Sequence, residues 1–402
     1  MIWSIIYAID FLLWIIIAGS VLYVCFFAVI SIFNRVESGE WREESGERNT
    51  TFLVLYPAYH EDAVILHSVR QFLLSDYPKD KFRLAVISDH MESSTNDQLV
   101  ALPITLLLPS FKNSSKAKAL QYAIHSLDEE EAFDYVVILD ADNVVRPDFL
   151  TKLEISCTHG YKVIQCHRCA KNSDNDIAVL DGVSEEINNT LFRRAHNTIG
   201  LSSALIGSGM CFDFKWFQKH VGLLNSAVED RELETMLMKE NIFIKFEDDI
   251  PVYDEKVSSS SNFQRQRLRW MTGQVQTLLL MMPYIPKAII SGNINYLDKT
   301  IQQALIPRAL LIVFLALCCI LSPLIAFFSP LSTLLAYLFV LKWWGLFVLL
   351  SISLLIALPP QLRRIAILKK ITALPQLAWN MLANLFKINH RNKDFIHTTH
   401  NK

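Results

Sequence analysis

Residues 135–142 read Tyr-Val-Val-Ile-Leu-Asp-Ala-Asp, a short apolar run that ends in two carboxylates one residue apart. The run Tyr135–Leu139 has the length and composition of a buried strand. Alternate residues of an extended segment point to the same face, so we expect Asp140 and Asp142 to point together from the strand end. Mg²⁺ or Mn²⁺ prefers oxygen ligands of this kind, and the pattern therefore predicts a metal site.

The sequence before this stretch alternates further apolar runs with helical patterns. It predicts strands at Thr51–Tyr56, Leu84–Ser88 and Ile104–Leu108, and helices at Asp62–Leu74 and Lys116–Leu127. Strand–helix alternation is typical of an α/β domain with a mostly parallel sheet. Ligands of such sheets bind beyond the carboxyl ends of the strands, so the residues after each run are candidates for a site.

Polar residues follow three of these strands. Pro57–Asp62 follows the first strand, Asp89-His90 the second and Asp140–Asp142 the fourth. A single acidic residue at a strand end can equally be a helix N-cap. Three acidic strand ends at one edge of a sheet favour a site for a cation or a polyol.

Two further patterns lie downstream. Val228–Arg231 opens a helical pattern, and a carboxylate there, Glu229 or Asp230, could take a proton from an acceptor hydroxyl. The alternative is an acidic first turn that complements the helix dipole. Gln264–Trp270 places arginines beside an indole. Arginine forks suit a diphosphate and tryptophan suits a sugar ring, whereas the alternative is a basic helix at a membrane surface.

The apolar residues exceed what a wholly soluble enzyme needs. Hydrophobic residues make up 51% of the 402 residues and charged residues only 19%. The segment Phe11–Phe33 carries no charge and is long enough to cross a hydrocarbon core of about 30 Å. A cleaved signal peptide would have basic residues before its apolar core, and none precedes Phe11. We therefore expect a retained membrane anchor.

A second apolar region lies near the other end of the chain. Ala309–Phe328 is uncharged, Ser329-Pro330 offers a break, and the run that follows reaches Leu362 with Lys342 as its only charge. This pattern predicts a hairpin of two transmembrane helices, and a separate short or re-entrant element at Leu331–Leu341 stays open.

The flanking cations indicate an orientation. Cations follow the first span and lie on both outer sides of the hairpin: Arg35, Arg42, Arg48, Arg308, Arg363, Arg364, Lys369 and Lys370. The positive-inside rule then places the N-terminus outside and both the middle of the chain and the C-terminus in the cytoplasm. The expected location is the cell (inner) membrane, crossed more than once.

Charge and cysteine content exclude other classes. The formal net charge is −2, which leaves no global basic field to bind a nucleic acid. Seven cysteines are too sparse for a disulfide framework, in agreement with a reducing compartment.

Taken together, the motifs resemble the membrane-bound family 2 glycosyltransferases, the group of hyaluronan, chitin and cellulose synthases. The resemblance covers about residues 50–275 and rests on motifs at Pro57–Asp62, Asp89, Lys116/Lys118, Asp140-x-Asp142, Gly207–Met210, Glu229-Asp230 and Gln266-x-x-Arg269-Trp270. It implies a GT-A fold, which is Rossmann-like, and an inverting transfer from a nucleotide sugar, usually linked to UDP.

The resemblance also implies roles on the donor side. Tyr59 and Glu61 would line the nucleoside pocket, with Asp89 near the base or ribose. Lys116 or Lys118 would contact the nucleotide. The remaining donor-side residues are Asp140, against the ribose or diphosphate and the metal, Asp142, which holds Mg²⁺ or Mn²⁺, and Gly209. The second motif reads Ser88-Asp89-His90 where many relatives have two adjacent aspartates, which leaves the nucleoside contacts open.

On the acceptor side, the resemblance makes Asp230 the general base, with Glu229 beside it. Gln266, Arg269 and Trp270 would hold the diphosphate and cap the acceptor site. The expected partners are a nucleotide-sugar donor, a carbohydrate or lipid-linked acceptor and the lipid bilayer, with no nucleic acid; a homo-oligomer is compatible with the sequence.

These patterns divide the chain into five parts. They are an anchor (1–34), a cytoplasmic GT-A domain (35–263), the Gln-x-x-Arg-Trp segment with interfacial helices (264–303), a transmembrane hairpin (304–362) and a basic interfacial helix with a tail (363–402). The leading hypothesis is synthesis of a polysaccharide. The alternatives are transfer of one sugar to a lipid acceptor, as in a glycolipid or polyprenyl-phosphate sugar synthase, and an inactive membrane scaffold.

Overall fold

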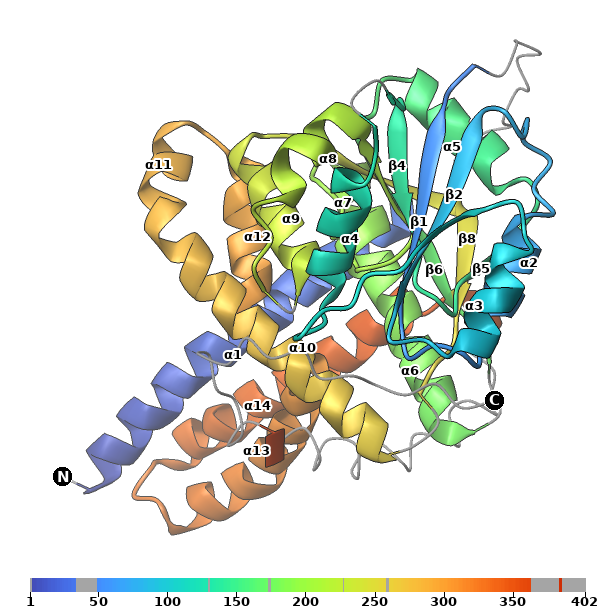
Figure 1. The fold of residues 1–402 in the computed structure, drawn as a ribbon. Coiled ribbons are helices and arrows are strands. Elements are labelled where there is room, and N and C mark those ends of the chain that lie inside the picture. Colours follow the sequence, from blue (N-terminus) through green and yellow to red (C-terminus); the bar gives the residue numbers. More distant parts are fainter. Residues whose placement is uncertain are drawn as a thin grey trace.

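The computed structural model, drawn in Figure 1, has a central sheet with helices on both faces and three long apolar helices beside it. It describes residues 2–33, 49–128, 131–172, 175–226, 228–257, 260–362 and 383–384. Some expectations fall outside these ranges, namely those on the cations Arg35, Arg42, Arg48, Arg363, Arg364, Lys369 and Lys370 and on the basic C-terminal helix and tail.

Eight strands form one mixed sheet in the order β3-β2-β1-β4-β7-β6-β8-β5. The strands are β1 Phe52–Tyr59, β2 Phe82–Asp89, β3 Thr105–Leu107, β4 Tyr135–Ile138, β5 Val144–Val145, β6 Val163–Ala170, β7 Met210–Asp213 and β8 Ile244–Asp254. The pairings β1–β2, β1–β4, β2–β3 and β6–β8 are parallel, whereas β4–β7, β6–β7 and β5–β8 are antiparallel. The expected fold class, an α/β domain with a mostly parallel sheet, is confirmed.

The first two strands extend beyond their apolar runs. β1 and β2 pair in register as far as Tyr59 opposite Asp89, so polar residues expected after the strands are their last residues. The next residues, His60 and His90, both have a positive φ, of 53° and 57°. Non-glycine residues adopt this conformation rarely, and such strain often occurs at functional sites.

Two apolar layers cover the sheet. On one face, residues such as Val54 and Val86 pack against α2 (Ile65–Phe72), α3 (Ser93–Val100) and α5 (Phe149–Thr158). On the other, residues such as Leu55 and Ile87 pack against α4 (Lys116–His125), α8 (Phe214–Val221) and α9 (Glu229–Lys239). Figure 1 shows these two groups of helices on opposite sides of the strands.

The remaining helices connect the sheet to the apolar helices. They are α6 (Asp176–Asn188), a π-helical turn (Asn189–Arg194), α7 (Ala195–Thr198), α10 (Ser260–Met281), α11 (Ile285–Ile290) and α12 (Ile294–Ala304). Figure 1 shows α10 crossing between the sheet and the long apolar helices. Large apolar side chains at the end of α10 and in α11 are exposed, including Leu279, Leu280, Ile289 and Ile290.

Three helices are long and apolar enough to cross a membrane: α1 (Ile2–Phe33), α13 (Arg308–Phe328) and α14 (Thr333–Ala357). They pack together and against the π-helical turn and α7. The expected break at Ser329-Pro330 separates α13 from α14. A separate element at Leu331–Leu341 is wrong, because α14 begins at Thr333 and continues through Lys342 as one helix.

The single lysine of α14 has a partner inside this bundle. Lys342 Nζ donates to the carboxylate of Asp10 in α1, and Trp343 Nε1 donates to the other oxygen of Asp10 at 3.0 Å. A charge in an apolar bundle is costly without a partner. Asp10 and Lys342, the only charged residues of α1 and α14, therefore join these two helices.

Candidate active site

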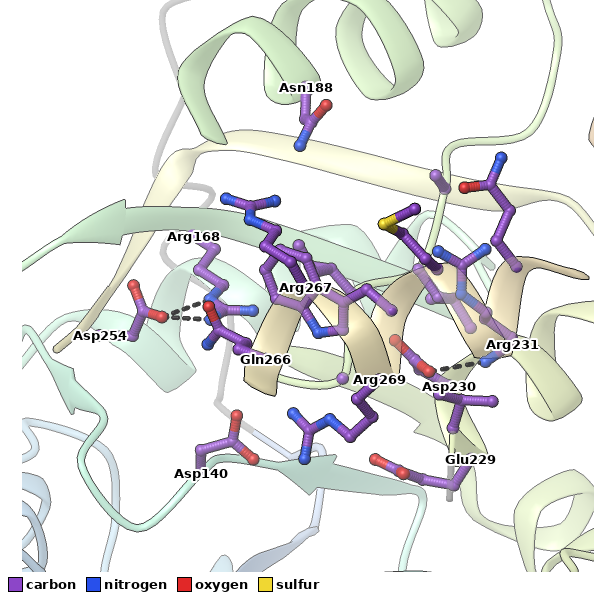
Figure 2. A pocket seen from close by; sticks show the side chains of 18 of the residues that line it. Asp140, Arg168, Asn188, Glu229, Asp230, Arg231, Asp254, Gln266, Arg267 and Arg269 are labelled. Atoms are coloured by element: carbon purple, nitrogen blue, oxygen red, sulfur yellow. Dashed lines mark hydrogen bonds and ion pairs between the residues drawn. The ribbon is translucent and has the colours of Figure 1, made fainter. Parts of the chain in front are cut away.

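A cavity of about 490 Å³ opens at the carboxyl ends of β1, β2 and β4 and is bordered by α9 and α10 (Figure 2). Most of the residues singled out in the sequence line it: Tyr59, Glu61, Asp89, Lys116, Asp140, Asp142, Glu229, Asp230, Gln266, Arg269 and Trp270. Lys118 and Gly209 do not. The structure thus brings residues from strand ends and two distant helices into one space.

The two aspartates after β4 lie in a tight turn. β4 ends at Ile138, and the Asn143 backbone N–H donates to the Asp140 carbonyl at 3.0 Å. The sequence analysis expected Asp140 and Asp142 to share one face of an extended strand. That explanation is wrong, because both residues lie in a turn. A turn reverses the chain within a few residues and keeps both aspartates at the strand end.

Asp142 is held by the groups behind it. Its side chain is 5% exposed, and its carboxylate accepts bonds from the Glu255 backbone N–H at 2.7 Å and the Asn143 side chain at 3.1 Å. Such bonds fix the orientation of a metal-binding carboxylate. Asp140 and Glu255 also line the cavity. This donor set consists of carboxylate oxygens alone and fits Mg²⁺ or Mn²⁺.

Lys116 connects three parts of the site. Its Nζ donates to Asp140 Oδ1 and to the Gly207 carbonyl, and it lies 3.5 Å from Glu229 Oε1. Burial alone would lower the pKa of Lys116, but the charges of Asp140 and Glu229 outweigh it and raise the pKa. Lys116 is therefore a fixed positive charge between two carboxylates.

Lys118 is placed elsewhere. It is exposed, and its Nζ donates to the Asn113 carbonyl at 2.5 Å. Helix residues that are two positions apart in the sequence, such as Lys116 and Lys118, point about 200° apart around the helix axis. Only one of these lysines can therefore face the cavity. Of the two lysines considered from the sequence, the structure places Lys116 at the site.

The loop before β7 explains the two glycines. Gly207 has a φ of +51°, and a Cβ there would lie 3.7 Å from Asp230 Oδ2 and 4.0 Å from Lys116 Nζ. Gly209 has a φ of +64°, and a Cβ there would meet Val252 at 3.0 Å, away from the cavity. Gly207 thus borders the reacting space, whereas Gly209, expected at the substrate, lets the loop pack on β8.

The first turn of α9 carries the two acidic residues. Glu229 is 7% exposed, and burial raises its pKa to about 7 against the opposing charge of Lys116. Asp230 is half-buried, and its carboxylate accepts the Arg231 backbone N–H at 2.9 Å. The two neighbours differ: Glu229 is paired with Lys116, while Asp230 points into the cavity near Gly207.

One face of α10 forms the opposite wall. Gln266, Arg269 and Trp270 lie three and four residues apart, which places them on the same side of a helix. In Figure 2 the Arg269 side chain lies between those of Asp140 and Glu229. The Gln266 Oε1 atom is buried without a hydrogen-bond partner among the described residues. This wall offers a cation, an amide and an indole to a ligand.

The sequence profile described as "Glycosyl transferase family group 2" matches residues 135–381, more than half of the chain. The chain belongs to this family. The expected glycosyltransferase family is therefore confirmed, and the chain is a family 2 glycosyltransferase.

Solved structures resemble this family 2 glycosyltransferase to a limited degree. The mannosyltransferase PcManGT from Pyrobaculum calidifontis, in complex with GDP-Man and Mn²⁺, is 15% identical over 85% of this chain and 97% of its own, with a TM-score of 0.48. TarS 1–349 from S. aureus, in complex with UDP-GlcNAc, is 11% identical over 85% and 93%, with a TM-score of 0.37. Glucosyl-3-phosphoglycerate synthase from Mycobacterium tuberculosis is 18% identical over 57% and 78%, with a TM-score of 0.39.

The cavity of this family 2 glycosyltransferase is also lined by charged residues that the sequence motifs did not indicate. Arg168 on β6 donates to Asp254 on β8, with Nε 2.6 Å from Oδ2. Burial would raise the pKa of Asp254, but Arg168 and Lys256 lower it. Arg267 lies over Trp270 at 4.5 Å and donates to Asp181 on α6. Only Arg267 had a sequence signal, because it lies inside the Gln-x-x-Arg-Trp motif.

Proposed function

We propose that this chain is a membrane-bound inverting glycosyltransferase of the polysaccharide-synthase type, which moves a sugar from a UDP-sugar onto a growing carbohydrate. The observation that carries this proposal is that the carboxylate turn, Asp230 and the α10 wall line one cavity. Single displacement at an anomeric carbon needs a base on the acceptor side and charge stabilisation on the leaving-group side. The cavity offers groups for both tasks.

On the donor side, Asp140 and Asp142 would hold Mg²⁺ or Mn²⁺, which neutralises charge on a diphosphate when bound. Lys116 keeps Asp140 in place and shares its positive charge with this side of the cavity. Arg269 offers a guanidinium fork to the departing diphosphate. Tyr59, Glu61 and Asp89, at the ends of β1 and β2, border the space for the nucleoside.

On the acceptor side, Asp230 takes the proton of the incoming hydroxyl. Its Oδ2 faces Gly207, where no side chain blocks the approach. Glu229 is the weaker candidate because it is buried against Lys116. Its role is to hold Lys116, whose Nζ lies 3.5 Å from its Oε1.

The same proposal includes the membrane. Three crossings by α1, α13 and α14 would place the N-terminus outside and the cavity on the cytoplasmic side, where nucleotide sugars are present. The cation distribution read from the sequence supports this orientation. Exposed apolar side chains on α10 and α11 support contact of these helices with the lipid surface.

A second candidate is the transfer of one sugar to a lipid acceptor. It is favoured by the far wall of the cavity, which includes Ser20 and Val24 of α1 and Ile306–Ala309 at the start of α13. The space that begins at the sheet therefore reaches helices that could cross a membrane. An acceptor could enter from the bilayer by this route.

The test is release of the nucleoside diphosphate from a panel of nucleotide sugars by the full chain in lipid nanodiscs, followed by sizing of the product. We expect cleavage of a UDP-sugar that depends on a divalent ion and yields a ladder of carbohydrate lengths. A single lipid-soluble product would favour the second candidate. Cleavage of no donor, by a protein that binds UDP and Mn²⁺ normally, would overturn both and favour a scaffold.

A further inference from the structure

The membrane end of the cavity has an excess of positive charge. Around it lie five cations, Arg168, Arg193, Arg267, Arg308 and Lys256, and three carboxylates that pair with them, Asp181, Glu185 and Asp254. All of these except Lys256 and Glu185 line the cavity. The described residues therefore leave two positive charges in this cluster without a carboxylate.

The carboxylates are already engaged by other cations. Arg193 Nη1 lies 3.0 Å from Glu185, and Lys256 lies 2.9 Å from Asp254, which also binds Arg168. Asp181 pairs with Arg267. Among the described residues, no carboxylate accepts a hydrogen bond from the fourth arginine.

Arg308 is that arginine. In the part of the chain that the structure describes, its Nη2 donates to neutral groups, namely the Ser184 carbonyl at 3.0 Å, the Ser184 hydroxyl at 3.2 Å and Asn188 Oδ1 at 2.8 Å. Its Nη1 is buried and has no hydrogen-bond partner among the described residues. The charges of Arg267 and Arg193 repel Arg308, and the charge of Glu185, which forms its own ion pair with Arg193, attracts it. Arg308 is half-buried, its Nη1 is buried without a partner in the described ranges and it lines the cavity, which suits it to an anionic ligand.

The surroundings of Arg308 indicate which anion. Arg308 is the first residue of α13, one of the helices long enough to cross a membrane. The adjacent cavity wall includes Val24 of α1, Ile306 and Ala309. A ligand here would present an anion to Arg308 and an apolar chain to the helices. Arginine recognises phosphate through its planar fork, so a lipid phosphate matches both features.

We propose that the Arg308 end of the cavity binds the phosphate or diphosphate that joins the sugar of a lipid-linked acceptor to its apolar chain. This inference rests on the second candidate of the proposed function, transfer to a lipid acceptor, and names the chemical class of that acceptor. The sugar of such a lipid would extend along the α10 wall toward Asp230, whereas Asp140 and Asp142 face the donor. Neutral glycolipids and free oligosaccharides lack the group that Arg308 requires.

The test measures binding of a short-chain prenyl diphosphate to the full chain in phosphatidylcholine nanodiscs, beside the matching prenyl alcohol and inorganic pyrophosphate. We expect the prenyl diphosphate to bind more tightly than either comparator. Arg308→Gln should weaken it by about tenfold to a hundredfold, the effect of losing a charged hydrogen bond. Arg308→Lys, which keeps the charge, should weaken it less.

A second variant neutralises Arg308 without removing it. Asn188→Asp would place a carboxylate at the atom that now accepts from Arg308 Nη2 at 2.8 Å, and this internal anion should compete with the lipid phosphate. The matched control is Arg83→Gln, which removes an arginine paired with Glu131 far from the cavity and should change nothing. Affinity for UDP with Mn²⁺ reports on the donor side in each variant.

The outcomes separate this inference from the proposed function. Equal affinity for the diphosphate and the alcohol, or no effect of Arg308→Gln and Asn188→Asp, would overturn the lipid phosphate site. Pyrophosphate binding as tightly as the lipid would reduce the site to a general anion site and also overturn it. Loss of UDP binding in Arg308→Gln would assign the arginine to the donor instead. If no nucleotide sugar is cleaved in the release assay but the prenyl diphosphate still binds, the result would count against the proposed function alone.

Discussion

The two ends of the cavity differ in how their charges are balanced. At the donor end, the carboxylates of Asp140 and Asp142 are held by Lys116 and by bonds from the chain behind them. At the membrane end, the cluster has more cations than carboxylates, and the hydrogen-bond partners of Arg308 within the described part of the chain are neutral. The donor end is thus prepared for a cation and its phosphates, and the membrane end for an anion without a cation. Under the two proposals above, one cavity would bind two phosphate-bearing ligands, each at its own end.

The largest expected effect lies where the two ends meet. Asp230→Asn keeps the size of the side chain and removes its basicity, so transfer should fall by about a hundredfold to ten-thousandfold, the usual contribution of a general base. Affinities for UDP and for a prenyl diphosphate should both stay within about twofold. Rates at saturating substrates together with both binding constants check this.

The matched control for this variant is Asp97→Asn on the exposed surface of α3, which should transfer sugar normally. Full activity of Asp230→Asn would remove Asp230 from the role of base and shift attention to Glu229.

Asp142→Ala should break the donor end and leave the membrane end intact. We expect affinity for UDP in the presence of Mn²⁺ to fall by about a hundredfold, and EDTA to produce no further loss. Binding of the prenyl diphosphate should not change. Calorimetry with and without Mn²⁺ measures both. A parallel loss of lipid binding would mean that the two ends are one site.

The donor end could be predicted from the sequence because its parts are local. Tyr59, Asp89 and Asp140 each follow an apolar run, and parallel strands bring such ends to one edge. The choice between Lys116 and Lys118 required the register of α4, which the sequence did not define. The turn at Asp140–Asp142 could not be predicted either, because two aspartates separated by one residue are compatible with both a strand and a turn.

The membrane end could not be predicted because its contacts join distant segments. Arg308 meets Ser184 and Asn188 across more than a hundred residues, and no spacing rule connects them. From the sequence, Arg308 served only as a cation beside a span. Arg168 meets Asp254 through the parallel pairing of β6 with β8, which comes from assembly of the sheet.

Loosening the apolar helices should affect the membrane end first. Lys342→Met leaves the Asp10 carboxylate among apolar helices without its cation, which should cost about 2 kcal/mol or more and lower the melting temperature by several degrees. Because α1 supplies Ser20 and Val24 to the cavity, the KM for a lipid acceptor should rise more than the KM for the donor.

The control is the double variant Asp10→Asn with Lys342→Met, which removes both charges and should recover most of the lost stability. A double variant as unstable as Lys342→Met would show that the lysine stabilises the bundle by packing and not by its charge.

The smallest effect concerns the acid that borders Asp230. Burial raises the pKa of Glu229 to about 7, above the value of about 4.3 for an unfolded chain. Between these two pKa values the carboxyl of Glu229 is protonated in the folded protein and ionised in the unfolded chain. The stability that this proton contributes is therefore complete below the unfolded pKa and is lost as the pH rises through the folded pKa. The apparent melting temperature of the wild type should fall by a few degrees between about pH 5 and pH 8 for this reason.

Glu229→Gln should lack this pH-dependent fall in melting temperature, while Glu92→Gln, an exposed substitution before α3, should keep it. Thermal scans at both pH values measure the difference, and identical pH dependence in all three proteins would mean that Glu229 is ionised in the fold and that the donor end holds one more negative charge than we infer.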